Sequence, residues 1–203
     1  MMSLLYKDLM NLKQQARIYL LIIGIWIVVA GMENNPSFLG GVLAVFSILI
    51  AITAYAYDEK NGWDKYALTM PLGRRELVLS KYALALLTLV CSMVLFVGLN
   101  VALRTPGKEF LSLSCIFLAL GLLVMDVVLP LIFRFGVEKG RVVLMLAFLI
   151  PSVIGLVGGK LIPDSVTRIL FSEASMYVWV AAGVLLVPVS ASISLAIYQR
   201  KEF

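Results

Sequence analysis

Long uncharged apolar stretches alternate with short charged connections along this chain of 203 residues. A helix needs about 20 mainly apolar residues to cross the hydrocarbon of a bilayer. Six stretches approach or reach that length: Ile18–Met32, Phe38–Tyr57, Tyr82–Leu103, Phe110–Phe133, Val142–Gly159 and a last one within Ala174–Gln199. Strands of a barrel would instead alternate polar and apolar residues over about 10 positions. The pattern predicts an all-α membrane protein of six transmembrane helices, forming a single domain over residues 1–203.

The first span has the basic start and apolar core of a secretory signal peptide. No clear small-x-small cleavage motif follows Val29, and five more spans come after it. We therefore expect this segment to be retained in the protein as a transmembrane helix.

Residues 1–17, ahead of this span, predict an amphipathic helix. One face of that helix is apolar and is formed by Leu5, Leu9, Leu12 and Ala16. The polar residues lie elsewhere around it and include Lys7, Asp8, Asn11 and Gln14. Such a helix lies in the membrane interface. We expect it on the cytoplasmic side, either as a functional element or as a mere topological anchor.

Lys and Arg are distributed unevenly between the two sides of the predicted bundle. Of the 17 in the chain, 13 fall at the two termini and in the second-to-third and fourth-to-fifth connections. The opposite connections hold only Arg104, Lys108, Lys160 and Arg168. Since Lys- and Arg-rich loops stay in the cytoplasm, we expect both termini there. The net charge of +5 is then a topology signal, and we expect no nucleic-acid partner.

Composition limits the chemistry that this chain can perform. Hydrophobic residues make up 62% of it and charged residues 14%, with a mean hydropathy of +1.00. The chain has no His, and its two cysteines, Cys91 and Cys115, both lie in apolar segments. Two cysteines cannot form a zinc site alone, and the commonest general base is missing. We expect no metal, no cofactor and no catalytic residue, so that a membrane-embedded hydrolase is disfavoured.

The second predicted span carries a small residue at every third or fourth position. These residues are Gly40, Ala44, Ser47, Ala51 and Ala54. Small residues let two helices approach closely in lipid. We interpret the stripe as packing inside the bundle, with a subunit interface or a substrate path as the alternatives.

The longest cytoplasmic connection, residues 58–81, contains a short amphipathic segment. Its aromatic and apolar residues at i, i+3, i+4 and i+7 are Trp63, Tyr66, Ala67 and Met70. This spacing predicts a two-turn helix that Pro71 ends, with Gly73 allowing the turn into the next helix. Its apolar face either fills a groove on a partner or lies on the membrane with Trp63 at the headgroups.

Asp126 is the one charge within a predicted span. Charged side chains inside a membrane are costly and often functional, so Asp126 is a candidate for the substrate pathway. Arg134 lies two turns further along the same helix, past Pro130. We favour a structural role in which Arg134 or a neighbouring hydroxyl offsets the carboxylate. The functional alternative is a carboxylate that meets cationic groups of a substrate.

Two motifs resemble the type-2 exporter family of bacterial ABC transporter permeases. The first has an acidic residue after span two, then Trp63-Asp64-x-Tyr66, and then Met70-Pro71-Leu72-Gly73-Arg74-Arg75-Glu76 leading into Ser80-Lys81-Tyr82. The second is Pro130-Leu131-Ile132-Phe133-Arg134-Phe135-Gly136 with Glu138-Lys139-Gly140-Arg141. Within this family the chain looks most like small permeases of peptide exporters, including those for phenol-soluble modulins.

The resemblance implies a function and its partners. Such permeases work as a pair of six-span subunits, identical or closely related, in the bacterial cell membrane, with two ATP-binding cassette subunits beneath them. Carried over by position, Trp63, Asp64, Lys65, Tyr66 and Met70 would form the coupling helix that docks in the ATPase. The N-terminal helix would lie beside it, and residues 159–175 would form an outer loop that dips back into the membrane or remains a surface loop. The substrates would be amphipathic or hydrophobic peptides.

The chain has no ATP site of its own. A Walker A loop needs Gly-x-x-x-x-Gly-Lys and then Ser or Thr. The nearest match, Gly158-Gly159-Lys160-Leu161, lacks the first Gly and the hydroxyl and falls on the outer side. We therefore expect ATP and magnesium to bind a partner ATPase. The alternatives are an ion-coupled secondary transporter that uses Asp126 and a non-transporting immunity or accessory protein.

Overall fold

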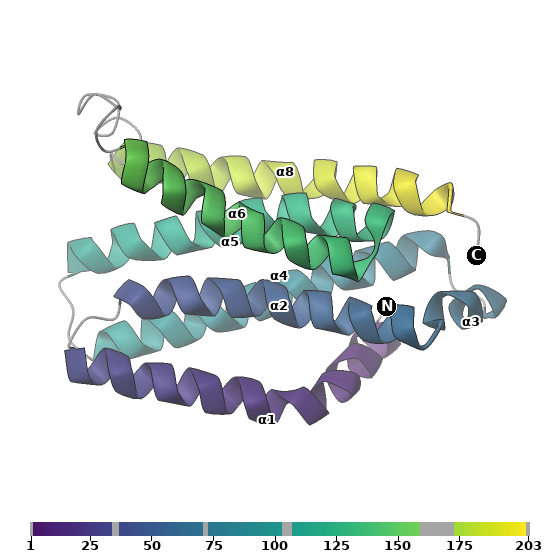
Figure 1. The fold of residues 1–203 in the computed structure, drawn as a ribbon, viewed down its shortest axis with the longest axis horizontal. Coiled ribbons are helices and arrows are strands. Elements are labelled where there is room, and N and C mark those ends of the chain that lie inside the picture. The colour runs from purple at the N-terminus through teal and green to yellow at the C-terminus, as the bar shows by residue number, and fades with distance from the viewer. Residues whose placement is uncertain (1, 34–36, 71–72, 103–106, 159–172, 202–203) are drawn as a thin grey trace.

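The computed structural model describes residues 2–33, 37–70, 73–102, 107–158 and 173–201, and this part of the chain is almost wholly helical. The helices are α1 (Met2–Glu33), α2 (Ser37–Lys60), α3 (Trp63–Thr69), α4 (Arg74–Ala102), α5 (Gly107–Phe135), α6 (Val137–Gly158) and α8 (Glu173–Gln199). The predicted all-α class is confirmed. The long helices run side by side, and the short α3 lies at one end of the bundle (Figure 1). Most of the expected outer loop, residues 159–172, lies outside the described residues.

Four of the helices are long and apolar enough to cross a membrane. They are Leu39–Lys60 in α2, Arg74–Ala102 as the whole of α4, Leu111–Phe135 in α5 and Ser175–Gln199 in α8. Helix α1 supplies a fifth if its two bent halves count as one span. The described residues thus form a multi-pass membrane protein of four or five candidate spans, and α6 covers the stretch predicted as the fifth of six.

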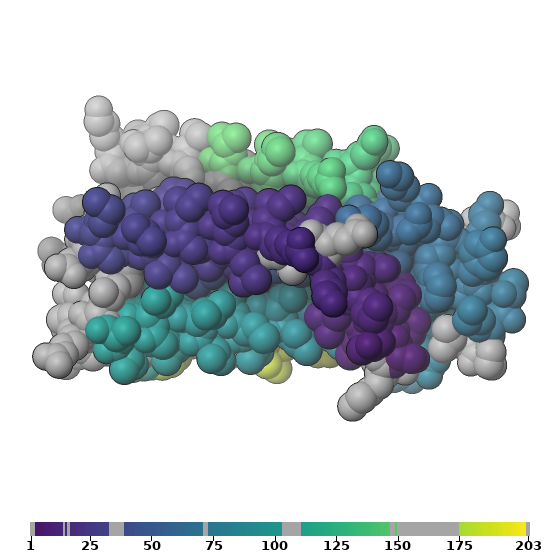
Figure 2. Space-filling view, turned by 90° about the horizontal axis from the view of Figure 1, so that it is seen from below, coloured from purple at the N-terminus to yellow at the C-terminus, as the bar shows by residue number. Residues whose placement is uncertain are grey.

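Helix α1 is bent by 70° between Ser3–Lys13 and Arg17–Met32. The first of these segments, here called the α1 arm, turns toward the end of the bundle where α3 lies (Figures 1 and 2). Its buried side chains are those of Leu4, Asp8 and Leu12, while Leu9 is exposed. The face that the α1 arm turns toward the bundle thus differs from the predicted apolar face, because a carboxylate takes a central place on it.

Helix α5 is the centre of the bundle and contacts α2, α4, α6 and α8. The small-residue stripe of α2 faces this interior, since Ala44, Ser47, Ala51 and Ala54 are all at most 4% exposed. At Gly40 the backbone lies against the rings of Phe96 and Phe117. The interpretation of this stripe as packing inside the bundle is confirmed.

Hydroxyl groups join α4, α5 and α8 inside the bundle. The Tyr82 hydroxyl lies 2.7 Å from the Ser190 hydroxyl and 2.8 Å from that of Ser194. Ser190 also donates a hydrogen bond of 2.7 Å to the backbone carbonyl of Asp126. Because lipid offers no competing partner, such bonds fix the rotation of neighbouring helices about their axes.

We predict that Gly40→Ala destabilises the protein. A Cβ atom at this position would lie 2.2 Å from Phe117 Cδ2 and 2.9 Å from Phe96 Cε2. These two rings already pack edge to face, and Phe96 is fully buried, so neither can yield freely. Overpacking of this kind costs about 1–3 kcal/mol. Thermal unfolding in detergent should show a lower midpoint for the variant.

The matched control is Gly98→Ala in α4, where a new Cβ meets nothing within 4 Å. There the higher helix propensity of Ala should leave the midpoint unchanged or raise it. Equal unfolding midpoints for the two variants would contradict the tight packing of α2 against α5.

Candidate functional site

The short helix α3 has an inward and an exposed side. It begins after Gly62, whose φ of +61° belongs to the left-handed region that glycine adopts readily. It ends at Thr69, so the predicted helix before Pro71 is present. Ala67 is fully buried and Trp63 half-buried, whereas Tyr66 is 66% and Met70 47% exposed. The face predicted from the sequence is thus divided: Trp63 and Ala67 hold α3 to the bundle, and Tyr66 and Met70 remain available.

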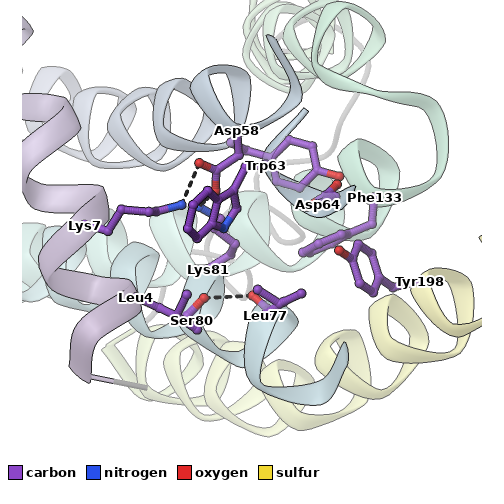
Figure 3. Close-up of a pocket in the computed structure, with 11 residues that line it drawn as sticks. Leu4, Lys7, Asp58, Trp63, Asp64, Leu77, Ser80, Lys81, Phe133 and Tyr198 are labelled. Carbon is purple, nitrogen blue, oxygen red and sulfur yellow. Dashed lines mark hydrogen bonds and ion pairs between the residues drawn. The ribbon is translucent and has the colours of Figure 1, made fainter. Parts of the chain in front are cut away.

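Trp63 connects α3 to the α1 arm. The Lys7 ammonium lies 4.3 Å from the centroid of the Trp63 ring, an arrangement in which the cation is attracted to the π face. Leu4 and Trp63 also line the same small cavity at this end of the bundle (Figure 3). The inward side of α3 therefore rests on residues from the N-terminus of the chain.

Beneath Trp63 lie four charged residues, Lys7, Asp8, Asp58 and Lys81, which we call the charge cluster. Lys81 Nζ lies 2.8 Å from Asp8 Oδ2 and 2.5 Å from Asp58 Oδ2. Lys7 Nζ lies 2.6 Å from Asp58 Oδ1 and 3.1 Å from Asp8 Oδ1. Each ammonium thus bridges both carboxylates, and the cluster joins α1, α2 and α4 (Figure 3 shows three of the four side chains).

The cluster is neutral and largely withdrawn from water. The side chains of Asp8, Asp58 and Lys81 are 1%, 5% and 9% exposed, and that of Lys7 is 22% exposed. Charges buried this deeply are tolerated only when they are paired and hydrogen-bonded, because desolvation costs several kcal/mol per ion. Two positive and two negative groups in mutual contact meet that condition.

Sequence reasoning missed this cluster. It assigned Lys7 and Asp8 to the polar side of an interfacial helix, and Asp58 and Lys81 to the ends of a loop. In the structure α2 continues to Lys60 and α4 begins at Arg74, so that Asp58 and Lys81 lie within helices. The available signal was that Asp58 and Lys81 directly border the apolar runs Phe38–Tyr57 and Tyr82–Leu103. Groups at such positions lie at the edge of the hydrocarbon and need partners of opposite charge.

Asp64 lies on the other side of the small cavity, near the end of α8 (Figure 3). Burial raises the pKa of its carboxyl, and the Tyr198 hydroxyl and Lys201 act in the opposite direction. The guanidinium of Arg74 donates hydrogen bonds to the backbone carbonyls of Tyr198 and Gln199, at the last turn of α8. Helix α3 and the start of α4 thereby meet the end of α8.

The cavity between these groups has a volume of about 10 Å³. That is room for about one water molecule. Two polar atoms in its lining, Trp63 Nε1 and the Tyr55 hydroxyl, have no hydrogen-bond partner in the described part of the chain. This cavity is far too small for a nucleotide or a peptide.

Asp126 is buried in α5, with 8% of its surface exposed. Neither carboxylate oxygen has a hydrogen-bond partner among the described residues. Arg134 is instead exposed, with its guanidinium 5.1 Å from the centroid of the Phe135 ring. The predicted offset of Asp126 by Arg134 or a hydroxyl was therefore wrong. Arg134 lies one residue before the end of the candidate span, where an exposed guanidinium can be hydrated.

Within the described ranges no group of three or more His, Cys, Asp or Glu side chains could hold a metal ion. Both cysteines are free, with Cys91 exposed and Cys115 half-buried. The features with the strongest functional character are therefore α3 with its charge cluster and the buried carboxylate of Asp126.

We predict that Lys81→Met strongly destabilises the fold, because it leaves Asp8 and Asp58 buried with only Lys7 between them. Removal of one partner from a buried ion pair costs about 3–5 kcal/mol. The double variant Lys81→Met/Asp8→Leu leaves Lys7 paired with Asp58, so that the cluster has no net charge. It should recover much of the lost stability. Thermal unfolding in detergent measures both effects, with the exposed Lys13→Met as control. Losses that simply add in the double variant would contradict the coupling between these residues.

The family comparison agrees with this architecture over nearly the whole chain. Residues 3–199 match the family described as ABC-2 family transporter protein, a stretch that runs from α1 to the end of α8. Comparison with curated proteins and with solved structures found no match. Membrane components of this family typically lack a nucleotide-binding site, and membership implies an ATPase partner. The chain therefore belongs to the ABC-2 transporter family, as a multi-pass membrane component of an ABC transporter.

Proposed function

We propose that this chain is the permease subunit of an ATP-driven exporter and that α3 is the helix by which a separate ATPase moves it. The observation that carries this proposal is the division of α3 into two sides. Tyr66 and Met70 are exposed at the end of the bundle, while Trp63 and Ala67 are fixed to it. An exposed aromatic residue beside a flexible Met is typical of a helix that fills a groove on a partner.

The charge cluster gives α3 a rigid connection to the spans. A displacement of α3 acts on Trp63, which lies against Lys7, and Lys7 contacts both carboxylates of the cluster. Separation of these buried charges would expose each to a medium that cannot solvate it. The α1 arm, α2 and α4 therefore move with α3 as one unit when the ATPase changes shape.

Asp64 and Lys65 complete the proposed contact with the ATPase. Lys65 is exposed, and Asp64 is half-buried beside Tyr198. The raised pKa of Asp64 means that its ionised form is held at some expense to stability, which is common for residues retained for function. In this proposal Lys65 contacts the ATPase surface. Asp64, which lies beside Tyr198, holds α3 in position against the end of α8.

The remaining features of the proposal rest on the charge pattern of the sequence and on its resemblance to small peptide-exporter permeases. Six spans place both termini in the cytoplasm of a bacterial cell, because 13 of the 17 Lys and Arg residues lie on that side. A second copy of the chain or a close paralogue completes the pathway. The substrates are amphipathic or hydrophobic peptides, and Asp126 meets their cationic groups within the membrane.

One observation favours a second candidate, an ion-coupled transporter. A buried carboxylate without a partner in the described part of the chain is the kind of group that binds a proton or a metal cation during transport. Membership of the ABC-2 family argues for the ATP-driven mechanism. The two candidates differ in whether an ATPase stays bound to this chain.

We predict that Tyr66→Ala/Met70→Ala releases the ATPase from the permease. The two side chains lie one turn apart and are exposed, so their removal leaves the fold intact. Loss of an aromatic anchor costs a protein interface about 2 kcal/mol or more, at least roughly a thirtyfold loss of affinity. Purification from the native membrane in mild detergent, followed by identification of the proteins that co-elute, measures this loss.

The chain provides a matched control in Tyr6 and Met10 of the α1 arm. They have the same residue types at the same spacing and are 67% and 55% exposed. Tyr6→Ala/Met10→Ala should retain the ATPase. If no ATPase accompanies even the wild-type protein, the ion-coupled candidate is favoured. An ATPase retained by both variants would refute α3 as its docking site.

We predict that Asp126→Asn lowers export of a cationic peptide from reconstituted vesicles while the ATPase stays bound. Loss of one charged contact is worth about 1.5 kcal/mol or more, about a tenfold loss in rate at limiting peptide. Asp126→Glu keeps the charge and should retain part of the activity. Undiminished export by the Asn variant would assign Asp126 a purely structural role.

A further inference from the structure

A second polar feature lies at the same end of the bundle, away from the charge cluster. It is an open groove of about 340 Å³ between the end of α2 and the start of α6, here called the α2–α6 groove. Figure 2 shows these two helices next to each other, α2 in blue and α6 in green. The groove is lined by Ala56, Glu59, Lys60, Phe135, Gly136, Val137, Glu138, Lys139 and Arg141. An apolar floor with charged rims is thus open to the surroundings at the point where the spans end.

The cations of this groove have no anionic partner. Lys60, Lys139 and Arg141 are exposed, and none of them forms an ion pair within the described part of the chain. Of the two carboxylates in the lining, Glu59 accepts a hydrogen bond of 3.0 Å from the backbone N–H of Val137. A carboxylate at a helix N-terminus is stabilised by the helix dipole. The charge of Glu59 is therefore already offset, and the groove has an excess of positive charge.

Phe135 is an unusual feature of the groove. It is 47% exposed at the end of a span, and two cations lie over its ring. Arg134 lies 5.1 Å and Lys139 5.4 Å from the centroid. Aromatic and basic residues placed together at the end of a span are typical of the headgroup level of a bilayer.

An exposed apolar stripe leads from the groove along α6. Val142, Met145 and Leu149 follow Glu138 at a helical spacing and are 56%, 67% and 57% exposed. The stripe runs along α6 away from its charged end. The site thus combines a place for one negative group with a path for a hydrocarbon chain.

We propose that the α2–α6 groove binds the headgroup phosphate of an anionic phospholipid, with one acyl chain along Val142, Met145 and Leu149. Lys139 and Arg141 face the phosphate from α6, and Lys60 faces it from α2. Arg141 supplies a planar group with paired donors that fits phosphate oxygens, and the two lysines add charge. Glu138 stands at the rim and disfavours ligands with several negative charges, so the site suits a lipid with a single one.

A soluble anion fits the site less well, because it would leave the apolar stripe and Phe135 without a partner. A protein partner would have to reach α6 at the level where the spans begin. The lipid satisfies the cations and the stripe together. This proposal does not depend on the exporter function and concerns a site outside α3.

The test uses the full-length purified protein and two lipids with identical acyl chains, phosphatidylglycerol and phosphatidylcholine. After removal of native lipid, each is titrated, and bound lipid is counted by native mass spectrometry. The wild type should bind phosphatidylglycerol in preference. Lys139→Gln/Arg141→Gln should weaken that binding about twentyfold to thirtyfold, since each basic residue near an anionic membrane surface contributes about a factor of five. The control Lys13→Gln/Arg75→Gln removes the same two charges from exposed positions elsewhere and should bind like the wild type.

Because the altered side chains are exposed and form no ion pair within the described part of the chain, the variant should keep the unfolding temperature of the wild type, which is checked on the same sample. Phe135→Ala provides a second variant that keeps every charge and should weaken binding to a smaller extent. Equal binding of both lipids by the wild type would overturn the proposal. So would unchanged binding of phosphatidylglycerol by the double variant, or an equal loss in the control. Loss of the ATPase from the double variant with lipid binding retained would instead identify the groove as a protein interface.

Discussion

The arrangement of this end of the molecule depends on four buried charges that neutralise one another. Lys7, Asp8, Asp58 and Lys81 come from three helices, and any one of them left unpaired at this depth would destabilise the fold. Their mutual contact requires the α1 arm to turn beneath the bundle, and the arm in turn supports Trp63. The position of α3 is thus a consequence of where the charges must meet. A helix held in this way, with Ala67 in the core and Trp63 against the α1 arm, can transmit force to the spans.

The same constraint explains the polar groups deeper in the bundle. Tyr82, Ser190 and Ser194 satisfy one another between α4 and α8, because lipid offers them nothing. Asp126 departs from this rule, since its carboxylate has no partner among the described residues although Ser190 bonds to its backbone. A buried carboxylate that lacks a partner beside hydroxyls that have theirs is a group whose retention needs a functional explanation.

The features of the structure that depend on local periodicity and composition could be predicted from the sequence. It predicted the helical class, the small-residue face of α2 and the short helix before Pro71, because each follows from local spacing. It did not predict that Asp8 is buried on the α1 arm, since a carboxylate on an amphipathic helix normally faces water. Nor did it predict that Arg134 leaves Asp126 unpaired, because spacing along one helix does not show where each side chain can reach. The candidate site depends on residues 73 and 51 positions apart, and such pairings depend on tertiary structure alone.

The end of α2 connects the charge cluster, the start of α6 and the α2–α6 groove. Three consecutive residues there have three different partners. Asp58 belongs to the charge cluster with α1 and α4, Glu59 caps the first turn of α6, and Lys60 lines the α2–α6 groove. Successive residues of a helix point about 100° apart, so one turn of α2 reaches three sides of the bundle. A shift of α3 that moves Asp58 therefore also moves Glu59 and the start of α6. In this way the proposed ATPase-docking helix and the proposed lipid groove both act on the same turn of α2.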